Sequence, residues 1–145
     1  VASLGELAEG RFAPVLPDEE VKAKSTKRIL MCSGKVYYDL LERREREKDR
    51  GTAILRLEQL YPLRLEELHR ALADHPGRAP LVWVQEEPEN MGAWRFLRHH
   101  LAGTLPGGRE FMGVYREASA SPATGSGTRH RQEQENLLDR AFARR

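Results

Sequence analysis

The sequence has 145 residues, of which 39% are hydrophobic and 32% charged, values that fit one globular domain with a core of its own. Its apolar runs are far shorter than the roughly 20 residues that a membrane-spanning helix needs, so we expect a soluble protein without a membrane partner. The 24 basic and 22 acidic residues are mixed along the chain and leave a formal charge of +2, a pattern that argues against nucleic acid as a partner.

The first 27 residues are predicted to form an amino-terminal arm or a linker from a preceding domain. Their pattern is irregular: Leu4 and Leu7 could form a helical turn that ends at Gly10, and two prolines keep the following segment extended. The chain begins with valine and shows no signal segment, so we expect it to be a piece of a longer protein. Residues 28–145 are predicted to form the folded domain.

From residue 28 onwards, short apolar runs alternate with helical stripes. Strands are expected at residues 29–32, 53–57, 81–84 and 111–115. Helices are expected at residues 36–48, 63–72, 93–101 and 132–142, and a polar loop at residues 118–131. Since parallel strands need long right-handed crossovers, this order predicts a three-layer α/β fold: a mostly parallel sheet of about four to five strands with helices on both faces.

Polar residues follow three of the expected strands. They are Ser33 and Lys35 after the first strand, Gln59 after the second, and Gln85, Glu86 and Glu87 after the third. Because the carboxyl ends of parallel strands meet at one edge of a sheet, these residues are predicted to share a functional edge.

Each group at this edge allows two interpretations. The helix start after Ser33 could bind an anion, or Ser33 could simply cap the helix. Glu86 and Glu87 could act as a general acid and base, or they could be acids that the dipole of the next helix favours. Asn90 is expected to cap that helix, which begins near Gly92.

No catalytic, cofactor-binding or metal-binding residue is predicted in this chain. The five histidines do not pair at helical spacing with each other or with Cys32, the only cysteine, so a zinc site is not expected. The sequence also contains neither a nucleophile elbow nor a dinucleotide fingerprint. Cys32 lies in an apolar run and is predicted to be a buried, inert thiol.

Four motifs together resemble a known family. They are KRILMCSGKVYYDLL (27–41), RLEQLYP (56–62), WVQEEPENMGAW (83–94) and ASASPATG (118–125). In these motifs the chain closely resembles the carboxy-terminal domain of the 2-oxoglutarate dehydrogenase decarboxylating component, and the resemblance also takes in EGRF (9–12) and the final helix. It implies a transketolase C-terminal-like domain over residues 28–145.

The resemblance implies a place in a larger enzyme. The parent would depend on thiamine diphosphate, decarboxylate 2-oxoglutarate and pass the succinyl group to a lipoyl arm in the tricarboxylic acid cycle. Thiamine diphosphate and magnesium would be bound by preceding domains that are absent here, so this chain should be inactive alone. The implied partners are the other domains of the polypeptide, a second copy in a homodimer, and the dihydrolipoyl succinyltransferase component. The location would be the cytoplasm of a bacterium, or the mitochondrial matrix of a eukaryote.

The resemblance also bears on the predicted edge. Candidates for effector binding are Arg11, Ser33, Lys35 and Gln59. Candidates for interface or structural-loop roles are Gln85, Glu86, Glu87, Asn90, Gly92 and Trp94. Arg11 and Gln59 match two residues of the acetyl-coenzyme A site of actinobacterial relatives. The arginine pair of that site falls at Glu66 and Glu67, and its serine at Pro14, so this effector is not expected in the same form.

Two alternatives remain open. The chain could be a free-standing regulatory module that binds a nucleotide or CoA through the edge at Ser33. It could also be the same domain of a 2-oxoadipate dehydrogenase, whose Glu-Glu-Pro-x-Asn-Met-Gly pattern it shares. One departure from the family is Tyr115, since relatives commonly have glycine before the arginine equivalent to Arg116.

Overall fold

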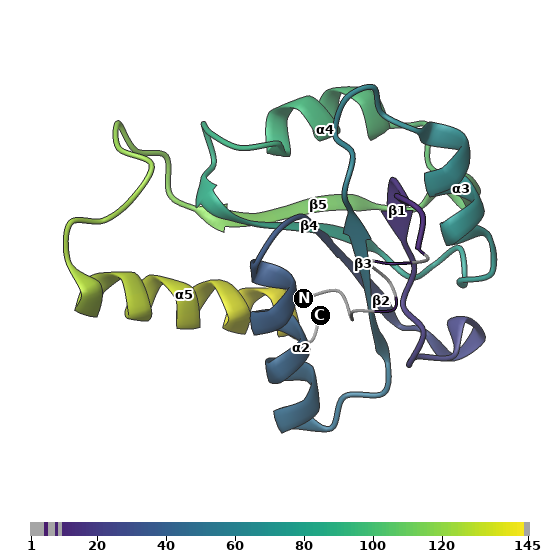
Figure 1. Cartoon of the computed structure of the whole chain (residues 1–145), viewed down its shortest axis with the longest axis horizontal. Coiled ribbons are helices and arrows are strands. Elements are labelled where there is room, and N and C mark those ends of the chain that lie inside the picture. Colours follow the sequence, from purple (N-terminus) through teal and green to yellow (C-terminus); the bar gives the residue numbers. More distant parts are fainter. Residues whose placement is uncertain (1–4, 6–7, 9, 144–145) are drawn as a thin grey trace.

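A mixed sheet of five strands forms the middle of the computed structural model, which describes residues 5, 8 and 10–143. The strands are β1 (Val15–Leu16), β2 (Arg28–Cys32), β3 (Thr52–Leu57), β4 (Leu81–Pro88) and β5 (Phe111–Arg116). Their spatial order is β1-β3-β2-β4-β5 (Figure 1). The last four strands run parallel and β1 is antiparallel to β3, which confirms the predicted mostly parallel sheet.

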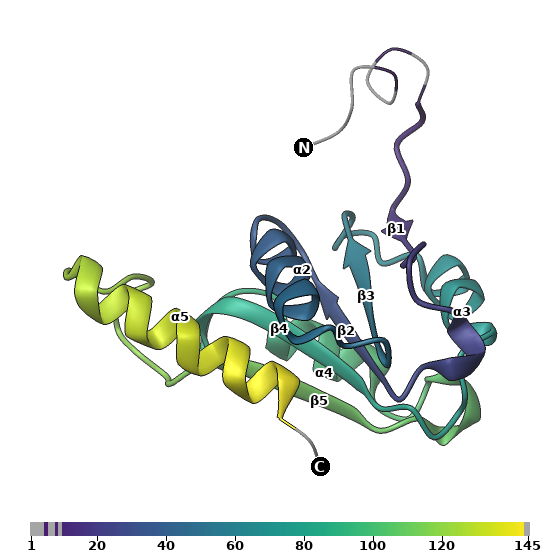
Figure 2. The ribbon, with the colours of Figure 1, turned by 90° about the horizontal axis from the view of Figure 1, so that it is seen from below.

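Helices cover both faces of this sheet. On one face lie α2 (Val36–Glu47) and α5 (Gly127–Phe142), and on the other lie α3 (Leu65–Ala73) and α4 (Trp94–Leu101), as Figures 1 and 2 show. Two short 3-10 segments, Ala23–Ser25 and Pro106–Gly108, complete the structure. The predicted three-layer α/β arrangement is therefore confirmed. No helix within the described residues is both long and apolar enough to span a membrane.

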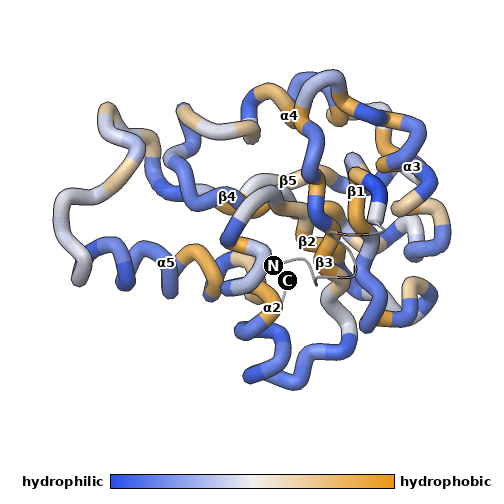
Figure 3. Tube along the Cα trace, in the orientation of Figure 1, coloured by the Kyte–Doolittle hydropathy of each residue, from blue (hydrophilic) through white to orange (hydrophobic). Residues whose placement is uncertain are grey.

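Alternate residues of each strand build two separate cores. Ile29 and Met31 of β2 pack in the core beneath α3 and α4, whereas Leu30 and Cys32 pack in the core beneath α2 and α5. Both faces of the central strands are thus apolar, as expected for parallel strands covered on both sides. Figure 3 shows that α5 is hydrophilic over its first turns and hydrophobic toward its end, where it reaches this core. Cys32 is fully buried, as predicted, and burial raises the pKa of its thiol to about 12.

The segment predicted as an arm contributes one strand and a buried ion pair. β1 pairs with β3 through Val15 and Leu57. Further along, the Asp18 carboxylate accepts hydrogen bonds from the Arg44 guanidinium and, at 2.7 Å, from the Ile54 amide. The side chains of Asp18 and Arg44 are only 3% and 5% exposed, so this pair fixes the arm to α2 and β3. The helical turn predicted at Leu4 and Leu7 lies outside the described residues.

Two predicted boundaries were wrong. The third expected strand continues past Val84 to Pro88, because β4 resumes pairing with β5 at Pro88 and Arg116 after an irregularity. The last helix begins at Gly127, inside the segment predicted as a loop, with the Ser126 side chain accepting from the Arg129 amide. Its first turns are exposed and carry no apolar stripe, so hydrophobic periodicity could not reveal them.

Candidate functional site

The polar residues predicted to share an edge lie at the carboxyl ends of β2, β3 and β4. Lys35, just after β2, donates to the Glu86 carboxylate at 2.5 Å and lies 3.8 Å from Asp39. The hydrogen bond to Glu86 is the main cause that raises the pKa of Lys35 above its usual value. Gln59 follows β3, and its side-chain amide donates to the Pro62 carbonyl at 2.9 Å. Its backbone amide donates to the Pro14 carbonyl of the arm. At this edge, side chains therefore link the ends of β2 and β4, and the end of β3 is linked to the arm.

Gln85 organises the corner that follows β4. Its side chain is buried, and its Oε1 accepts from Trp83 Nε1 and from the Trp94 amide, both at 2.8 Å. Its Nε2 donates to the carbonyls of Met91 at 2.7 Å and Pro88 at 3.1 Å. A buried amide with its donors and acceptors all used holds the surrounding backbone in one conformation. Gln85 therefore has a structural role.

Gly92 has to be glycine for two reasons. Its φ is +65°, a conformation that side chains disfavour, and a Cβ would lie 2.9 Å from Gln85 Nε2. Trp94 follows it at the start of α4 and packs against Phe111 and Tyr115, with ring centroids 5.4 and 5.5 Å apart. Motif 83–94 therefore encodes a rigid turn between β4 and α4.

Asn90 and Arg116 fasten the Ser-rich loop to this edge. The Asn90 side chain exchanges two hydrogen bonds with the Ser119 backbone, at 2.9 and 3.0 Å. The Arg116 guanidinium donates to the Glu86 carbonyl, to Glu133 of α5 at 3.2 Å and to the Pro122 carbonyl at 2.6 Å. A loop that the sequence marks only by composition is thus bound from both sides.

Both predicted helix caps were wrong. α2 begins after Lys35 and α4 begins after Ala93, and neither start has a side-chain cap. Ser33 lies too early in the turn, and Asn90 uses its amide on Ser119 instead. At Asn90 a tertiary contact thus replaces the local hydrogen bond that the residue type suggests.

Glu86 and Glu87 do not form an acid and base pair. Glu86 is half-buried and bound to Lys35, whereas Glu87 is exposed to solvent. They occupy successive positions of β4, where side chains point to opposite faces. Among the described residues, no group of three His, Cys, Asp or Glu side chains could hold a metal ion.

Comparison with known proteins adds the decisive observation. Residues 1–142 match the family described as 2-oxoglutarate dehydrogenase C-terminal. The chain belongs to this family. The resemblance inferred from the four motifs is thereby confirmed.

Three relatives of the 2-oxoglutarate dehydrogenase C-terminal domain illustrate the match. The 2-oxoglutarate dehydrogenase E1 component of Cupriavidus necator is 43% identical over 145 residues, covering 99% of this chain and 15% of the relative. The 2-oxoglutarate dehydrogenase E1 component of Azotobacter vinelandii is 42% identical over 146 residues, covering 98% of this chain and 16% of the relative. The 2-oxoadipate dehydrogenase complex component E1 of Xenopus laevis is 39% identical over 140 residues, covering 94% and 15%. The chain thus spans 15–16% of the length of these relatives.

The effector candidates are spread out on this family domain. Arg11 is exposed in the arm ahead of β1, and Gln59 lies where β1 meets β3. Lys35 lies between β2 and α2 and already pairs with two carboxylates. Glu66 and Glu67 occupy the first turn of α3, where Glu67 pairs with Arg64 at 3.1 Å. The structure therefore brings Lys35 to Glu86 rather than to Arg11.

Sequence reasoning missed two features of the family domain. One is Arg109, whose guanidinium donates to the carbonyls of Pro76 and Ala79 and so stabilises the loop between α3 and β4. The other is a groove of about 1140 Å³ at the amino edge of the sheet, opposite the predicted edge. Its residues come from several separate segments, so no local motif could have indicated it.

Proposed function

We propose that this chain is the last domain of the decarboxylating component of a 2-oxoglutarate dehydrogenase, in which it has a structural and non-catalytic role. One observation carries the proposal: nearly the whole chain matches a part, 15%, of a relative named 2-oxoglutarate dehydrogenase E1 component. A domain that occupies so small a share of an enzyme depends on the rest of it for a complete reaction.

The chemistry of the carboxyl edge supports a structural role. Gln85 and Asn90 use their amides on loop backbones, and Lys35 and Glu86 neutralise each other. Groups already satisfied in this way are not poised to move protons or to attack a substrate. They do make a rigid, polar surface on which another domain could rest.

Under this proposal the parent enzyme decarboxylates 2-oxoglutarate and passes the succinyl group to the lipoyl arm of a dihydrolipoyl succinyltransferase. The reaction of such a parent requires thiamine diphosphate and magnesium, and this chain covers only 15% of the relative that carries the proposal. We therefore assign both groups to domains outside this chain, and dimer formation to the whole polypeptide. The cytoplasm is the proposed location in a bacterium.

Two other functions rank lower. A 2-oxoadipate dehydrogenase is favoured by the relative from Xenopus laevis, whose identity of 39% is below the 43% of the relative from Cupriavidus necator. A free-standing module that binds a nucleotide or CoA at Ser33 would need the Lys35 ammonium, which already contacts Glu86 and Asp39.

The test compares this chain with the full-length protein from its source. We expect a native mass well above that of this chain, and thiamine-dependent oxidation of 2-oxoglutarate, followed with ferricyanide, by the full-length protein alone. Turnover by the isolated chain would refute the non-catalytic role. If the full-length protein oxidises 2-oxoadipate faster than 2-oxoglutarate, the proposed substrate is wrong and the 2-oxoadipate dehydrogenase is favoured. If the full-length protein has the same length as this chain, the free-standing module is favoured.

The structural role has its own measurement. Hydrogen exchange at the amides of residues 85–94 should be slower in the full-length protein than in the isolated chain, because another domain would cover the carboxyl edge. Residues 97–101 of α4, whose amides are bonded within the helix, serve as the internal control. Equal exchange at residues 85–94 in both proteins would show that this edge is not an interface.

A further inference from the structure

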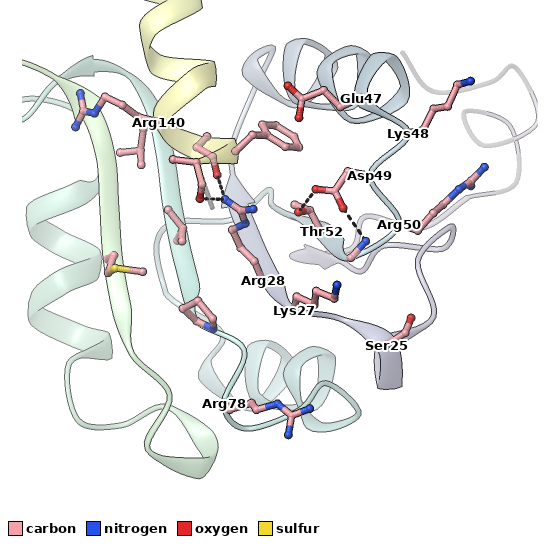
Figure 4. A pocket seen from close by; sticks show the side chains of 18 of the residues that line it. Ser25, Lys27, Arg28, Glu47, Lys48, Asp49, Arg50, Thr52, Arg78 and Arg140 are labelled. Atoms are coloured by element: carbon pink, nitrogen blue, oxygen red, sulfur yellow. Dashed lines mark hydrogen bonds between the residues drawn. The ribbon is translucent and has the colours of Figure 1, made fainter. Parts of the chain in front are cut away.

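The groove at the amino edge of the sheet has a strongly basic lining. It lies between the beginnings of β2, β3 and β4 and the ends of α2 and α5 (Figure 4). Six basic residues line it: Lys27, Arg28, Lys48, Arg50, Arg78 and Arg140. Only two acidic residues, Glu47 and Asp49, line it as well. The groove therefore carries a net positive charge although the whole chain is close to neutral.

The two acidic residues are held mainly by other partners, although Asp49 also interacts with the charge of Arg28. Glu47 accepts a hydrogen bond from Arg43, whose guanidinium also donates to Asp139 of α5. Asp49 accepts from the Gly51 amide at 2.7 Å and from the Thr52 hydroxyl at 2.6 Å, so it stabilises the turn before β3. Among the residues that the structure describes, no carboxylate lies within ion-pair distance of Lys27, Lys48, Arg50 or Arg78.

The remaining two cations have structural partners. Arg28 donates to the carbonyls of Ala141 and Ala143 at 2.7 and 2.8 Å, which places its positive charge between the end of α5 and the groove. Arg140 donates to the Tyr115 carbonyl at 2.7 Å. The carbonyls at the end of α5, which would otherwise repel an anion, are thus partly neutralised.

The positions of the cations favour an extended ligand over a compact one. In Figure 4 Arg140, Lys27, Arg50 and Arg78 stand apart around the groove instead of converging on one point. A single phosphate or carboxylate is held by donors that meet at one place. The volume of about 1140 Å³ is also above the range of roughly 300–1,000 Å³ usual for small-molecule pockets.

The floor of the groove favours a peptide over nucleic acid. It is lined by apolar residues of β4, β5 and α5, of which Met112 is partly exposed, whereas Val82 and Val114 are only 5% and 7% exposed. The aromatic ring of Phe142 is only 6% exposed, so it offers no face on which a base could stack. An apolar floor with a cationic rim matches a chain that carries both acidic and aliphatic side chains.

We infer that this groove binds an extended acidic peptide segment of a separate protein chain. Glutamate or aspartate side chains of the partner pair with the exposed Lys27, Arg50 and Arg78, and an aliphatic side chain contacts Met112, the partly exposed residue of the floor. The inference does not depend on the reaction of the parent enzyme.

The test measures the binding of a fluorescein-labelled peptide of alternating Glu and Leu by fluorescence anisotropy to the full-length protein. The groove variant carries Lys27→Glu, Arg50→Glu and Arg78→Glu. The matched control carries Arg70→Glu, Arg98→Glu and Arg131→Glu, which change the net charge equally at exposed positions outside the groove. Circular dichroism checks that both are folded, and if the groove variant is not, Lys27→Gln, Arg50→Gln and Arg78→Gln replace its substitutions.

We expect the groove variant to bind the peptide at least about tenfold more weakly than wild type, and the control variant within about twofold of it. Binding should also weaken as salt is raised. Four results would overturn the inference: no binding to the wild-type full-length protein, equal weakening in the groove and control variants, equal binding of a peptide with Gln in place of Glu, and tighter binding of an oligouridylate that the groove substitutions abolish.

Discussion

Replacement of Gln85 by leucine should destabilise the domain severely. Leucine has a similar volume but leaves three groups without their partner: the Trp83 indole N–H, the Trp94 amide and the Met91 carbonyl. A buried polar group without a partner costs about 1–3 kcal/mol, so we expect Gln85→Leu to lower the free energy of unfolding by about 3–4 kcal/mol. That is a large part of the roughly 5–15 kcal/mol typical of a domain.

The assay is guanidinium unfolding followed by tryptophan fluorescence. It is well suited to this change because the sequence has two tryptophans and Gln85 contacts both of them. Gln59→Leu is the control: Gln59 makes one side-chain hydrogen bond at an exposed corner, and its loss should cost less than about 1 kcal/mol. If Gln85→Leu costs no more than the control, Gln85 does not organise the corner and the structural reading of motif 83–94 is wrong.

Three further changes test other parts of the fold. Arg44→Met leaves the Asp18 carboxylate buried without its cation and should cost about 3–5 kcal/mol in denaturant unfolding, whereas Arg46→Met, at an exposed position, should cost under about 1 kcal/mol. Burial, and then the charge of a neighbouring arginine, lower the pKa of His75 in the folded protein, so the unfolded chain binds the proton more readily. The contribution of His75 to stability should therefore be full above pH ~6.5 and be lost as the pH falls below that value. A pH profile of stability that His75→Gln leaves unchanged would contradict this. Gly113→Ala would put a Cβ 2.6 Å from the ring of the tyrosine two residues on, and should lower the melting temperature through a cost of about 1–3 kcal/mol; an unchanged melting temperature would mean that the rings move aside freely.

Most strands of the sheet could be predicted well because each of these is a short apolar run with clear ends. Residues 29–32 and 53–57 are almost wholly apolar, since both faces of each strand are covered, and long helical segments separate them. β1 was not predicted as a strand, because two residues with one buried side chain carry no periodic signal. Its pairing depends on β3, which is distant in sequence, and on the Asp18–Arg44 contact.

The carboxyl edge was predicted in location but only partly in detail. Parallel pairing brought Lys35 and Glu86 together as expected, because register alone decides which strand ends meet. Gln85 was a candidate for a structural-loop role, but its burial within β4 was not predicted, since a polar residue after four apolar ones is usually the start of a loop. The basic groove at the opposite edge depends on the positions of six separate side chains, which composition does not encode.

Arg28 contacts the end of α5 through Ala141 and Ala143, which follow it in the sequence by 113 and 115 positions. During synthesis the first parallel strand leaves the ribosome long before the carbonyls that its arginine requires exist. Folding of this unit therefore finishes only when the last helix has emerged. A chain truncated before α5 would lack the carbonyls that Arg28 binds and would leave an apolar sheet face uncovered, a form that quality-control proteases would recognise.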